Sequence, residues 1–172
     1  MEVTMQKLAP AKKTYKLKAK DPEALVIEMN KRHHVGEFAY DLGPTRISVN
    51  KDGSVKALKL AAKTQITMPS WAAYSKQTAK AKKEWDRFYK CLAFHERGHK
   101  LILMESFARI AEKARRLHEE RETEGTPLTP KDLQQVIQNE WMSSIVNDPQ
   151  DVYDNKTGHG RTQGAVFDAA KC

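Results

Sequence analysis

Cysteine is scarce in this 172-residue sequence, which contains two, Cys91 and Cys172. Two cysteines so far apart are too few for a disulfide scaffold and cannot form a CxxC metal or redox motif. Long apolar runs are absent as well, because the longest, Leu101 to Met104, is far below the ~20 residues that span a bilayer. The sequence therefore excludes a disulfide-rich mini-protein and a membrane-spanning protein.

The N-terminal segment, Met1 to Lys13, also lacks an apolar stretch of the kind found in secretory leaders. It alternates lysine with small apolar residues, so we expect it to be flexible and to contain no leader. An exported protein whose leader has already been removed fits the same sequence.

Acidic residues are outnumbered, with 22 Asp and Glu against 30 Lys and Arg, for a formal charge of +8. The basic excess is concentrated in residues 7–20 and 76–90, which favours acidic partners such as a cell-wall polymer or an acidic protein. A solvated surface is the simpler interpretation of both runs, and nucleic acid is not the expected partner. With 40% hydrophobic and 30% charged residues, the composition is that of a soluble globular protein.

The N-terminal half carries strand signals interrupted by one helix. A period of two from Tyr15 to Lys20 predicts a half-exposed strand, and Asp21 before Pro22 predicts a helix that extends to His33. An antiparallel meander is expected next, with strands at 37–42, 45–50 and 54–68 and turns at 43–44 and 51–53. The apolar parity of the last strand shifts between Ala57 and Leu58, which predicts a bulge or bend.

The C-terminal half is predicted to be helical. One apolar stripe at three- and four-residue steps predicts a long helix that ends near Leu117; its members are Trp85, Phe88, Leu92, His95, His99, Ile102, Ser106 and Ile110. A second helix is expected from Pro130 to Asn147, stopped at Pro149. The layout predicts one α+β domain over residues 1–172, with 165–172 as a tail.

The long helix carries an HExxH motif, His95-Glu96-Arg97-Gly98-His99. The two imidazoles lie one turn apart on the same face and can hold one Zn²⁺, and Glu96 can act as general base toward a zinc-bound water. The competing interpretation is two hydrogen-bonded core histidines beside an exposed glutamate.

A catalytic zinc needs a third protein ligand. The metzincin pattern requires Gly and His where this chain has Ile102 and Glu105, so that class is excluded. Glu119 stands 20 residues after His99, but an unbroken helix would carry it about 30 Å away. His118 and Glu120 are excluded for the same reason.

The remaining candidates lie in the segment from Tyr153 to Gly164. Because Gly158 and Gly160 flank His159 and allow a loop to approach closely, we predict His159 as the third ligand, with Asp154 as second choice. Tyr153 is a candidate hydrogen-bond donor to the oxyanion of a tetrahedral intermediate, and Arg161 is a weaker one. Both are also ordinary loop residues.

The sequence resembles a bacterial family of predicted secreted zinc-dependent proteases, catalogued as a domain of unknown function that carries HExxH. The resemblance covers roughly residues 15–167 and rests on Met68, Pro69, Trp71, Trp85, Phe88, Leu92 and the motif, followed by Tyr153, Asp154, Thr157, His159, Gly160, Gln163 and Gly164. It implies a zincin-like fold, a secreted or periplasmic location and a functional role for His159.

The leading hypothesis is a zinc-dependent metallopeptidase in which His95, His99 and His159 bind Zn²⁺, Glu96 is the general base and Tyr153 stabilises the oxyanion. As the zincin resemblance implies, the strand from Leu58 to Met68 would bind a protein or peptide substrate by strand addition. The alternatives are a basic polyanion-binding module with a structural metal or none, and an inactive scaffold. The sequence leaves the cleavage preference and the oligomeric state open.

Overall fold

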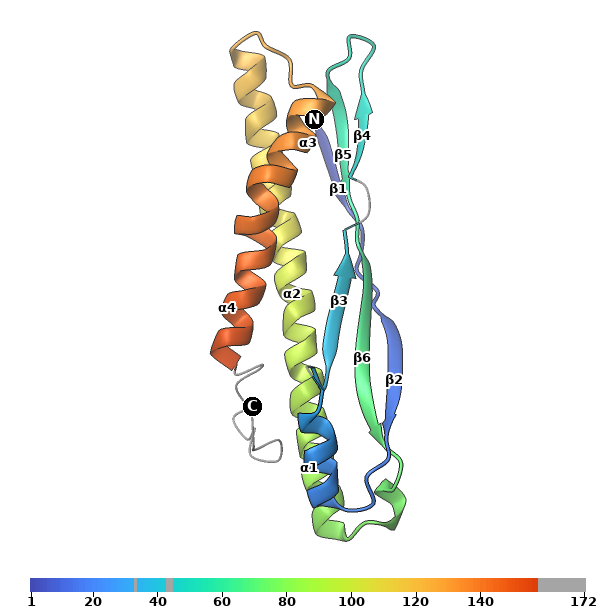
Figure 1. Ribbon diagram of the computed structural model, residues 1–172. Helices are drawn as coiled ribbons and strands as arrows, with labels where there is room; N and C mark the ends of the chain where they lie inside the picture. The colour runs from blue at the N-terminus through green and yellow to red at the C-terminus, as the bar shows by residue number, and fades with distance from the viewer. Residues whose placement is uncertain (33, 43–44, 158–172) are drawn as a thin grey trace. The chain divides into compact units, whose positions relative to one another are not determined.

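The structure, a computed structural model, describes residues 1–32, 34–42 and 45–157 (Figure 1). Its elements are β1 (Glu2–Met5), β2 (Ala11–Leu17), α1 (Pro22–Asn30), β3 (Glu37–Asp41), β4 (Arg46–Val49), β5 (Val55–Leu60), β6 (Lys63–Trp71), the 3₁₀ turn η1 (Tyr74–Lys76), α2 (Ala79–Thr123), α3 (Pro130–Val136), the π-helix η2 (Ile137–Asn147) and α4 (Asp148–Thr157). The fold is therefore mixed α+β, with two three-stranded sheets and a helix of 45 residues.

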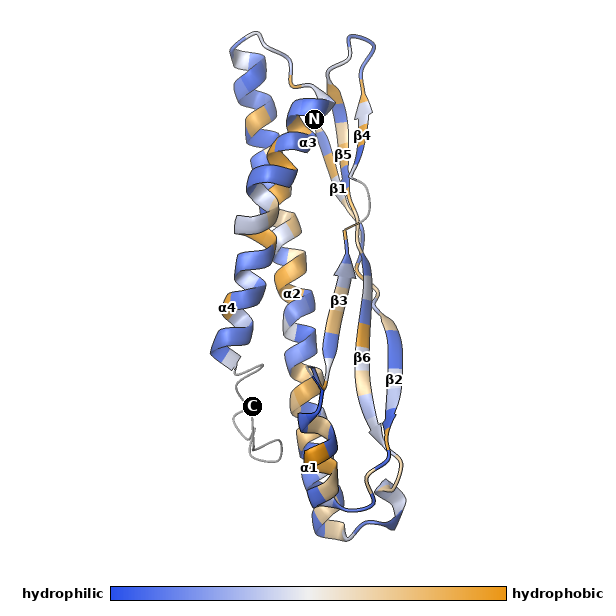
Figure 2. Ribbon diagram, viewed as in Figure 1, coloured by the Kyte–Doolittle hydropathy of each residue, from blue (hydrophilic) through white to orange (hydrophobic). Residues whose placement is uncertain are grey.

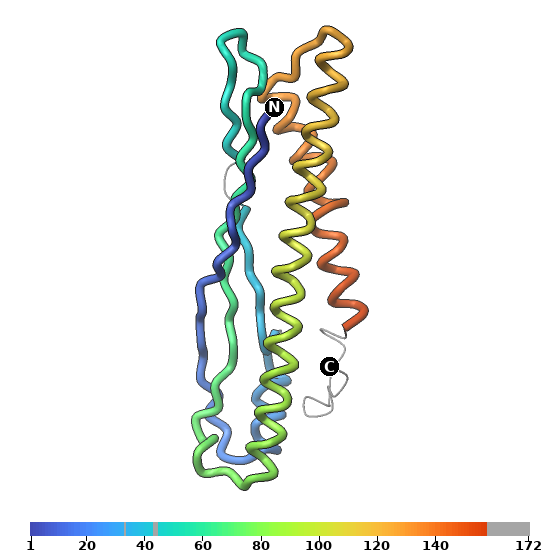
Figure 3. The backbone as a smooth tube through the Cα atoms, turned by 180° about the vertical axis from the view of Figure 1, so that it is seen from behind, coloured from blue at the N-terminus to red at the C-terminus, as the bar shows by residue number. Residues whose placement is uncertain are grey.

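The described residues fall into two compact units. Unit 1 contains residues 1–9, 101–152 and the described part of 40–63. Unit 2 contains residues 64–100, 153–157 and the described part of 10–39. Helix α2 begins in unit 2 and ends in unit 1, and Figure 3 follows it as one unbroken helix. None of the described helices is both long enough and apolar enough to cross a membrane.

Unit 1 contains the sheet of order β1-β5-β4. Strand β1 pairs with β5 in parallel, and β4 pairs with β5 in the antiparallel hairpin that the sequence predicts. The hairpin turn ends at Gly53, whose φ of 84° suits glycine. The segment 1–13, expected to be flexible, contains β1 and the first residues of β2.

The second predicted helix does not stop at Asn147, and this expectation was wrong. It passes through η2 into α4, which continues to Thr157, so Pro149 lies inside helical structure. A helical proline cannot donate to the carbonyl four residues earlier, which here belongs to Ile145. That carbonyl accepts a hydrogen bond from the hydroxyl of Ser106 at 2.6 Å. A polar partner on α2 therefore compensates for the proline.

Unit 2 contains most of the sheet of order β2-β6-β3. Strand β2 pairs with β6 in parallel, from Ala11 opposite Gln65 to Leu17 opposite Trp71. Helix α1 begins as predicted, with Asp21 accepting a hydrogen bond from the backbone N–H of Ala24 at 2.8 Å. The core of the unit joins α1, the sheet and α2 (Figure 2) and is formed by Leu17, Leu25, Met29, Trp71, Trp85 and Phe88.

The predicted three-strand meander was wrong apart from the β4–β5 hairpin. The single strand expected at 54–68 is interrupted at residues 61–62 and forms β5 and β6, which belong to different sheets. Strands β3 and β4, which were expected to be neighbours, also belong to different sheets. An apolar period of two shows that a segment is extended, but it does not specify which strand it pairs with. The predicted turn at 43–44 lies outside the described residues.

Candidate metal centre

Helix α2 presents the two histidines of the HExxH motif on one face, as their four-residue spacing requires. The Nε2 atoms of His95 and His99 lie 3.0 Å apart. His99 is buried, with 7% of its surface exposed, and the side chain of His95 is 13% exposed. Both rings are thus largely shielded from water while their Nε2 atoms converge.

The third member of the cluster comes from α4. Asp154 Oδ1 lies 3.3 Å from His95 Nε2 and 2.9 Å from His99 Nε2. The ligand atoms of His95, His99 and Asp154, the metal-site cluster, all lie within 4.8 Å of one another. Asp154, the second choice from sequence, is therefore the carboxylate at the motif. His159 and Arg161 lie outside the described residues.

The spacing of these three atoms fits a zinc ion. With zinc–nitrogen and zinc–oxygen distances of about 2.0–2.2 Å, neighbouring ligand atoms of a tetrahedral site are about 3.3–3.6 Å apart. The three separations in the cluster are 2.9, 3.0 and 3.3 Å, so binding would need only a small outward movement. Two imidazoles and one carboxylate are also the ligand types of known catalytic zinc sites.

Tyr153 packs against both histidines. Its ring stacks on His95 at a centroid distance of 5.0 Å and meets the edge of His99 at the same distance. Its hydroxyl lies 3.3 Å from the backbone oxygen of His95, over Gly98, where any Cβ would overlap the tyrosine. Glycine at this position of the motif therefore allows the ring to approach. The oxyanion role of Tyr153 stays a prediction.

The Tyr153 hydroxyl also titrates above its ordinary range. Burial raises its pKa, and the charges of Glu96 and Asp154 act in the same direction. The hydroxyl is therefore kept in its protonated form, the form that can donate a hydrogen bond.

Glu96 is fully buried on α2, with 0% of its surface exposed. Neither of its carboxylate oxygens makes a hydrogen bond of ordinary geometry to another described residue. Burial raises its pKa to about 8; the backbone N–H of Phe38 lowers it, and the charges of Asp154 and Glu37 add to the rise. Among the described residues, Glu96 does not belong to the metal-site cluster.

The segment around β3 covers this carboxylate. A Cβ on Gly36 would lie 2.6 Å from Glu96 Oε1 and 2.7 Å from a methyl group of Leu92, so only glycine fits without a shift. Two residues later, the ring of Phe38 lies parallel to that of His99 at a centroid distance of 6.4 Å. Phe38 on β3 and Gly36, the residue just before β3, thus both lie against the motif.

The predicted substrate-binding strand, Leu58 to Met68, was wrong in its position. Its two parts belong to β5 and β6, and each of these is the central strand of its sheet, with a neighbour on either side. A central strand has no free edge to which a peptide could add. The outer strand that contacts the motif is β3.

A comparison with protein families places the chain in one of them. A family described as "Bacterial protein of unknown function (DUF922)" matches residues 12–160. The chain belongs to this family. The matched range contains the whole metal-site cluster, together with His159. No curated protein and no solved structure matched the chain.

Three residues of the centre have roles that sequence reasoning missed. The sequence gives no role to Gly36, includes Phe38 only in the strand expected at 37–42, and points to Thr157 only through the family resemblance. Thr157 Oγ1 lies 3.0 Å from His95 Nδ1. Helical spacing is the sequence signal that could have identified Thr157, because it stands four residues after Tyr153 and three after Asp154. This signal applies only if the predicted helix continues past Pro149.

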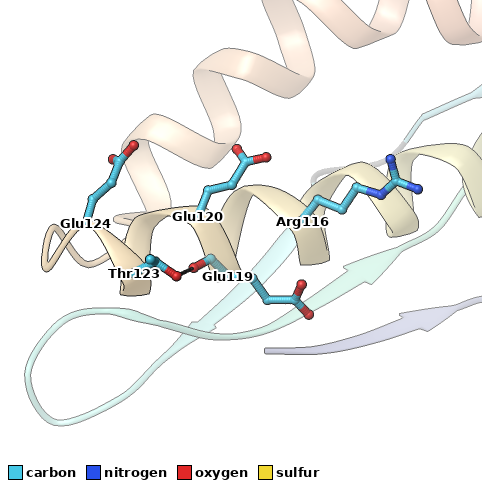
Figure 4. A pocket seen from close by; sticks show the side chains of 5 residues that line it. All are labelled: Arg116, Glu119, Glu120, Thr123 and Glu124. Atoms are coloured by element: carbon cyan, nitrogen blue, oxygen red, sulfur yellow. Dashed lines mark hydrogen bonds between the residues drawn. The ribbon is translucent and has the colours of Figure 1, made fainter.

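A concave surface at the end of α2 contains no motif residue. It is lined by Arg116, Glu119, Glu120, Thr123 and Glu124 (Figure 4). Glu119 and Glu120 were excluded as ligands because the helix was expected to be unbroken, and α2 does continue to Thr123. The described part of the chain places neither glutamate in the metal-site cluster.

Proposed function

We propose that the protein is a zinc-dependent hydrolase of the peptidase class. In this proposal His95, His99 and Asp154 are the metal ligands and Glu96 is the general base. The observation that carries this proposal is the convergence of two histidine Nε2 atoms and one carboxylate oxygen within 4.8 Å, beside a glutamate that is not itself a member of the cluster. HExxH helices of metallopeptidases combine the same residue types.

Each residue has a distinct task in this proposal. When bound, zinc supplies Lewis acidity toward a substrate carbonyl and toward water. Glu96 takes the proton of the attacking water and passes it to the leaving amine. Its pKa of about 8 without metal would fall beside a divalent cation, toward the range in which a carboxylate can both accept and return a proton.

The proposed substrate is an extended peptide that lies along β3, in a zincin-like arrangement of motif helix and outer strand. The support is the contact of Phe38 with His99 and the outer position of β3 in its sheet. Strand addition requires an extended backbone. A linear peptide should therefore be cleaved faster than its cyclised form, and equal rates would argue against this binding mode.

Metal content tests the ligand assignment. We would measure zinc, iron and manganese in protein prepared without chelator or histidine tag, for the wild type, Glu96→Gln, His99→Ala, Asp154→Ala and His159→Ala. Asp151→Ala is the matched control, because Asp151 is an exposed carboxylate one turn earlier on α4. We expect about one zinc per chain in the wild type, Glu96→Gln and the control, and loss in His99→Ala and Asp154→Ala.

Two outcomes would overturn parts of this proposal. Zinc lost in His159→Ala but retained in Asp154→Ala would replace Asp154 by His159 as third ligand. No bound metal in the wild type, even after zinc is added back, would remove the hydrolase proposal. Salt-sensitive binding to a polyanion, unchanged in Glu96→Gln, would then favour the basic binding module.

Activity on a labelled protein substrate tests the general base. Glu96→Gln should retain zinc and lose about 10²- to 10⁴-fold in kcat, the usual contribution of general acid–base catalysis. Full activity in the zinc-loaded Glu96→Gln variant would exclude Glu96 from the proton transfer.

A further inference from the structure

The side chain of Thr157, at the end of α4, joins the two helical segments of the metal centre. Its Oγ1 lies 2.7 Å from the backbone oxygen of Tyr153 and 3.0 Å from Nδ1 of His95. The first contact is the ordinary bond from a helical threonine to the carbonyl four residues earlier. The second contact is not explained by the helix, because His95 belongs to α2.

Counting protons assigns a direction to both bonds. A threonine hydroxyl has a single proton. A backbone carbonyl can only accept, so that proton goes to Tyr153. Oγ1 must then accept in its contact with His95, which requires the proton of a neutral His95 to be on Nδ1. The lone pair of this imidazole is consequently on Nε2. Because Asp154 Oδ1 is also an acceptor, the proton between these two atoms belongs to His99 Nε2, which lies 3.0 Å from His95 Nε2 and 2.9 Å from Asp154 Oδ1.

We propose that Thr157 is a positioning residue for His95, which holds the imidazole in the Nδ1–H tautomer with Nε2 directed at the metal. This inference rests on the proposed function and deepens it by naming a residue beyond the ligands. Metal-bound histidines usually donate their other ring N–H to an oxygen, which fixes both tautomer and ring orientation. Here a hydroxyl from the same helical turn as Asp154 does so.

The last turn of α4 thus contributes three side chains to the centre, opposite the HExxH turn of α2. Tyr153 supplies the ring that stacks on His95, Asp154 supplies the carboxylate and Thr157 supplies the acceptor for Nδ1–H. The spacing of these three residues places them on neighbouring positions of one helical face. The pattern Tyr-Asp-x-x-Thr therefore has a physical meaning in this chain.

Zinc affinity is the first test. We would measure the dissociation constant by competition with a chromophoric chelator for the wild type, Thr157→Val and Thr157→Ser. Valine has the shape of threonine without its hydroxyl, whereas serine keeps it. We expect Thr157→Val to weaken binding by about 10- to 100-fold, the usual effect of removing such a partner, and Thr157→Ser to restore affinity to within a few-fold of the wild type.

Thr123 provides a matched control. It makes the same bond to the carbonyl four residues earlier, from Oγ1 to Glu119 O at 2.9 Å, and it lies outside the centre. Thr123→Val should leave zinc affinity unchanged. If Thr157→Val binds zinc as tightly as Thr123→Val and the wild type do, the proposal is wrong.

Nitrogen NMR of the imidazoles in metal-free protein, at mildly alkaline pH, separates this inference from the proposed function. His95 should carry its proton on Nδ1 in the wild type and in Thr157→Ser, and should show a mixture of tautomers in Thr157→Val. The same tautomer in all three proteins would overturn the role of Thr157 even if zinc binds. The expected tautomer change in a protein that binds no zinc would retain the positioning role and reject the metal site.

Discussion

At the scale of single residues, Glu96 stands out for the environment of its carboxylate. A carboxylate that is fully buried and lacks hydrogen bonds of ordinary geometry is costly unless it is neutral. Burial accordingly raises its pKa to about 8. The residue is kept in an environment that stability alone does not favour, which is typical of catalytic groups.

The buried carboxyl predicts a pH dependence of stability in the metal-free protein. The pKa of Glu96 rises on folding from 4.5 to about 8, so the unfolded chain releases this proton first as pH increases. The free energy of unfolding should therefore fall between about pH 4.5 and pH 8, by at most about 1.4 kcal/mol per pH unit, and stay level above that range.

Urea unfolding of chelator-treated wild type and Glu96→Gln, measured from pH 4 upward, checks this prediction. Glutamine does not titrate, so the stability difference in favour of Glu96→Gln should grow with pH and then reach a plateau. Parallel pH profiles of the two proteins would show that Glu96 ionises with an ordinary pKa.

At the scale of elements, the passage of a helix through Pro149 decides which residues reach the motif. If the helix had stopped at Asn147, as the sequence suggested, Asp154 and Thr157 would not share a helical face. The π-helical stretch η2 and the bond from Ser106 to the Ile145 carbonyl accommodate the proline. Ser106, which sequence analysis placed on the apolar stripe, is 2% exposed and has a specific partner.

This arrangement predicts a coupling between Ser106 and Pro149. Ser106→Ala should lower the free energy of unfolding by about 1–3 kcal/mol, because it removes a buried hydrogen bond to a carbonyl. In a Pro149→Ala background the cost should be smaller, since alanine supplies the backbone N–H that proline lacks.

A double-mutant cycle by denaturant unfolding measures this coupling. Ser144→Ala is the matched control, because Ser144 donates to the carbonyl of Glu140 at an exposed position. Its loss should cost little and should not depend on residue 149. Additive effects of Ser106→Ala and Pro149→Ala would mean that the hydroxyl does not compensate for the proline.

At the scale of the whole molecule, the metal-site cluster joins segments that are far apart in the chain. His95 and Asp154 are separated by 59 positions and both belong to unit 2. A ligand that binds only the folded state stabilises it by mass action, by about 4 kcal/mol at a concentration 1,000 times its dissociation constant. The proposed zinc binding would require folding, because the unfolded chain does not hold His95, His99 and Asp154 together.

Zinc should therefore raise the melting temperature of the chelator-treated wild type, and the increase should depend on zinc concentration. Asp154→Ala should lose most of this increase, while Asp151→Ala should retain it. Thermal unfolding followed by circular dichroism checks both. An equal increase in all three proteins would indicate binding elsewhere on the chain.

The sequence by itself determined the features that depend on local chemistry. Asp21 and Pro22 define the start of α1, because a capping side chain and a fixed φ act within one turn. The spacing of His95 and His99 places both on one helical face, because the period of a helix is fixed. The turn before Ser54 follows from Gly53 for the same local reason.

Only the tertiary structure decided which elements meet. The strand predicted at 54–68 had the correct extended character, but its division into two central strands depends on partners elsewhere in the chain. The contact of Phe38 with His99 and the bond of Ser106 to Ile145 join residues 61 and 39 positions apart. The choice of Asp154 depends on a helix that continues through a proline, and its compensating hydroxyl lies on another helix. Propensity and periodicity describe neighbours along the chain, whereas such contacts arise from packing between distant segments.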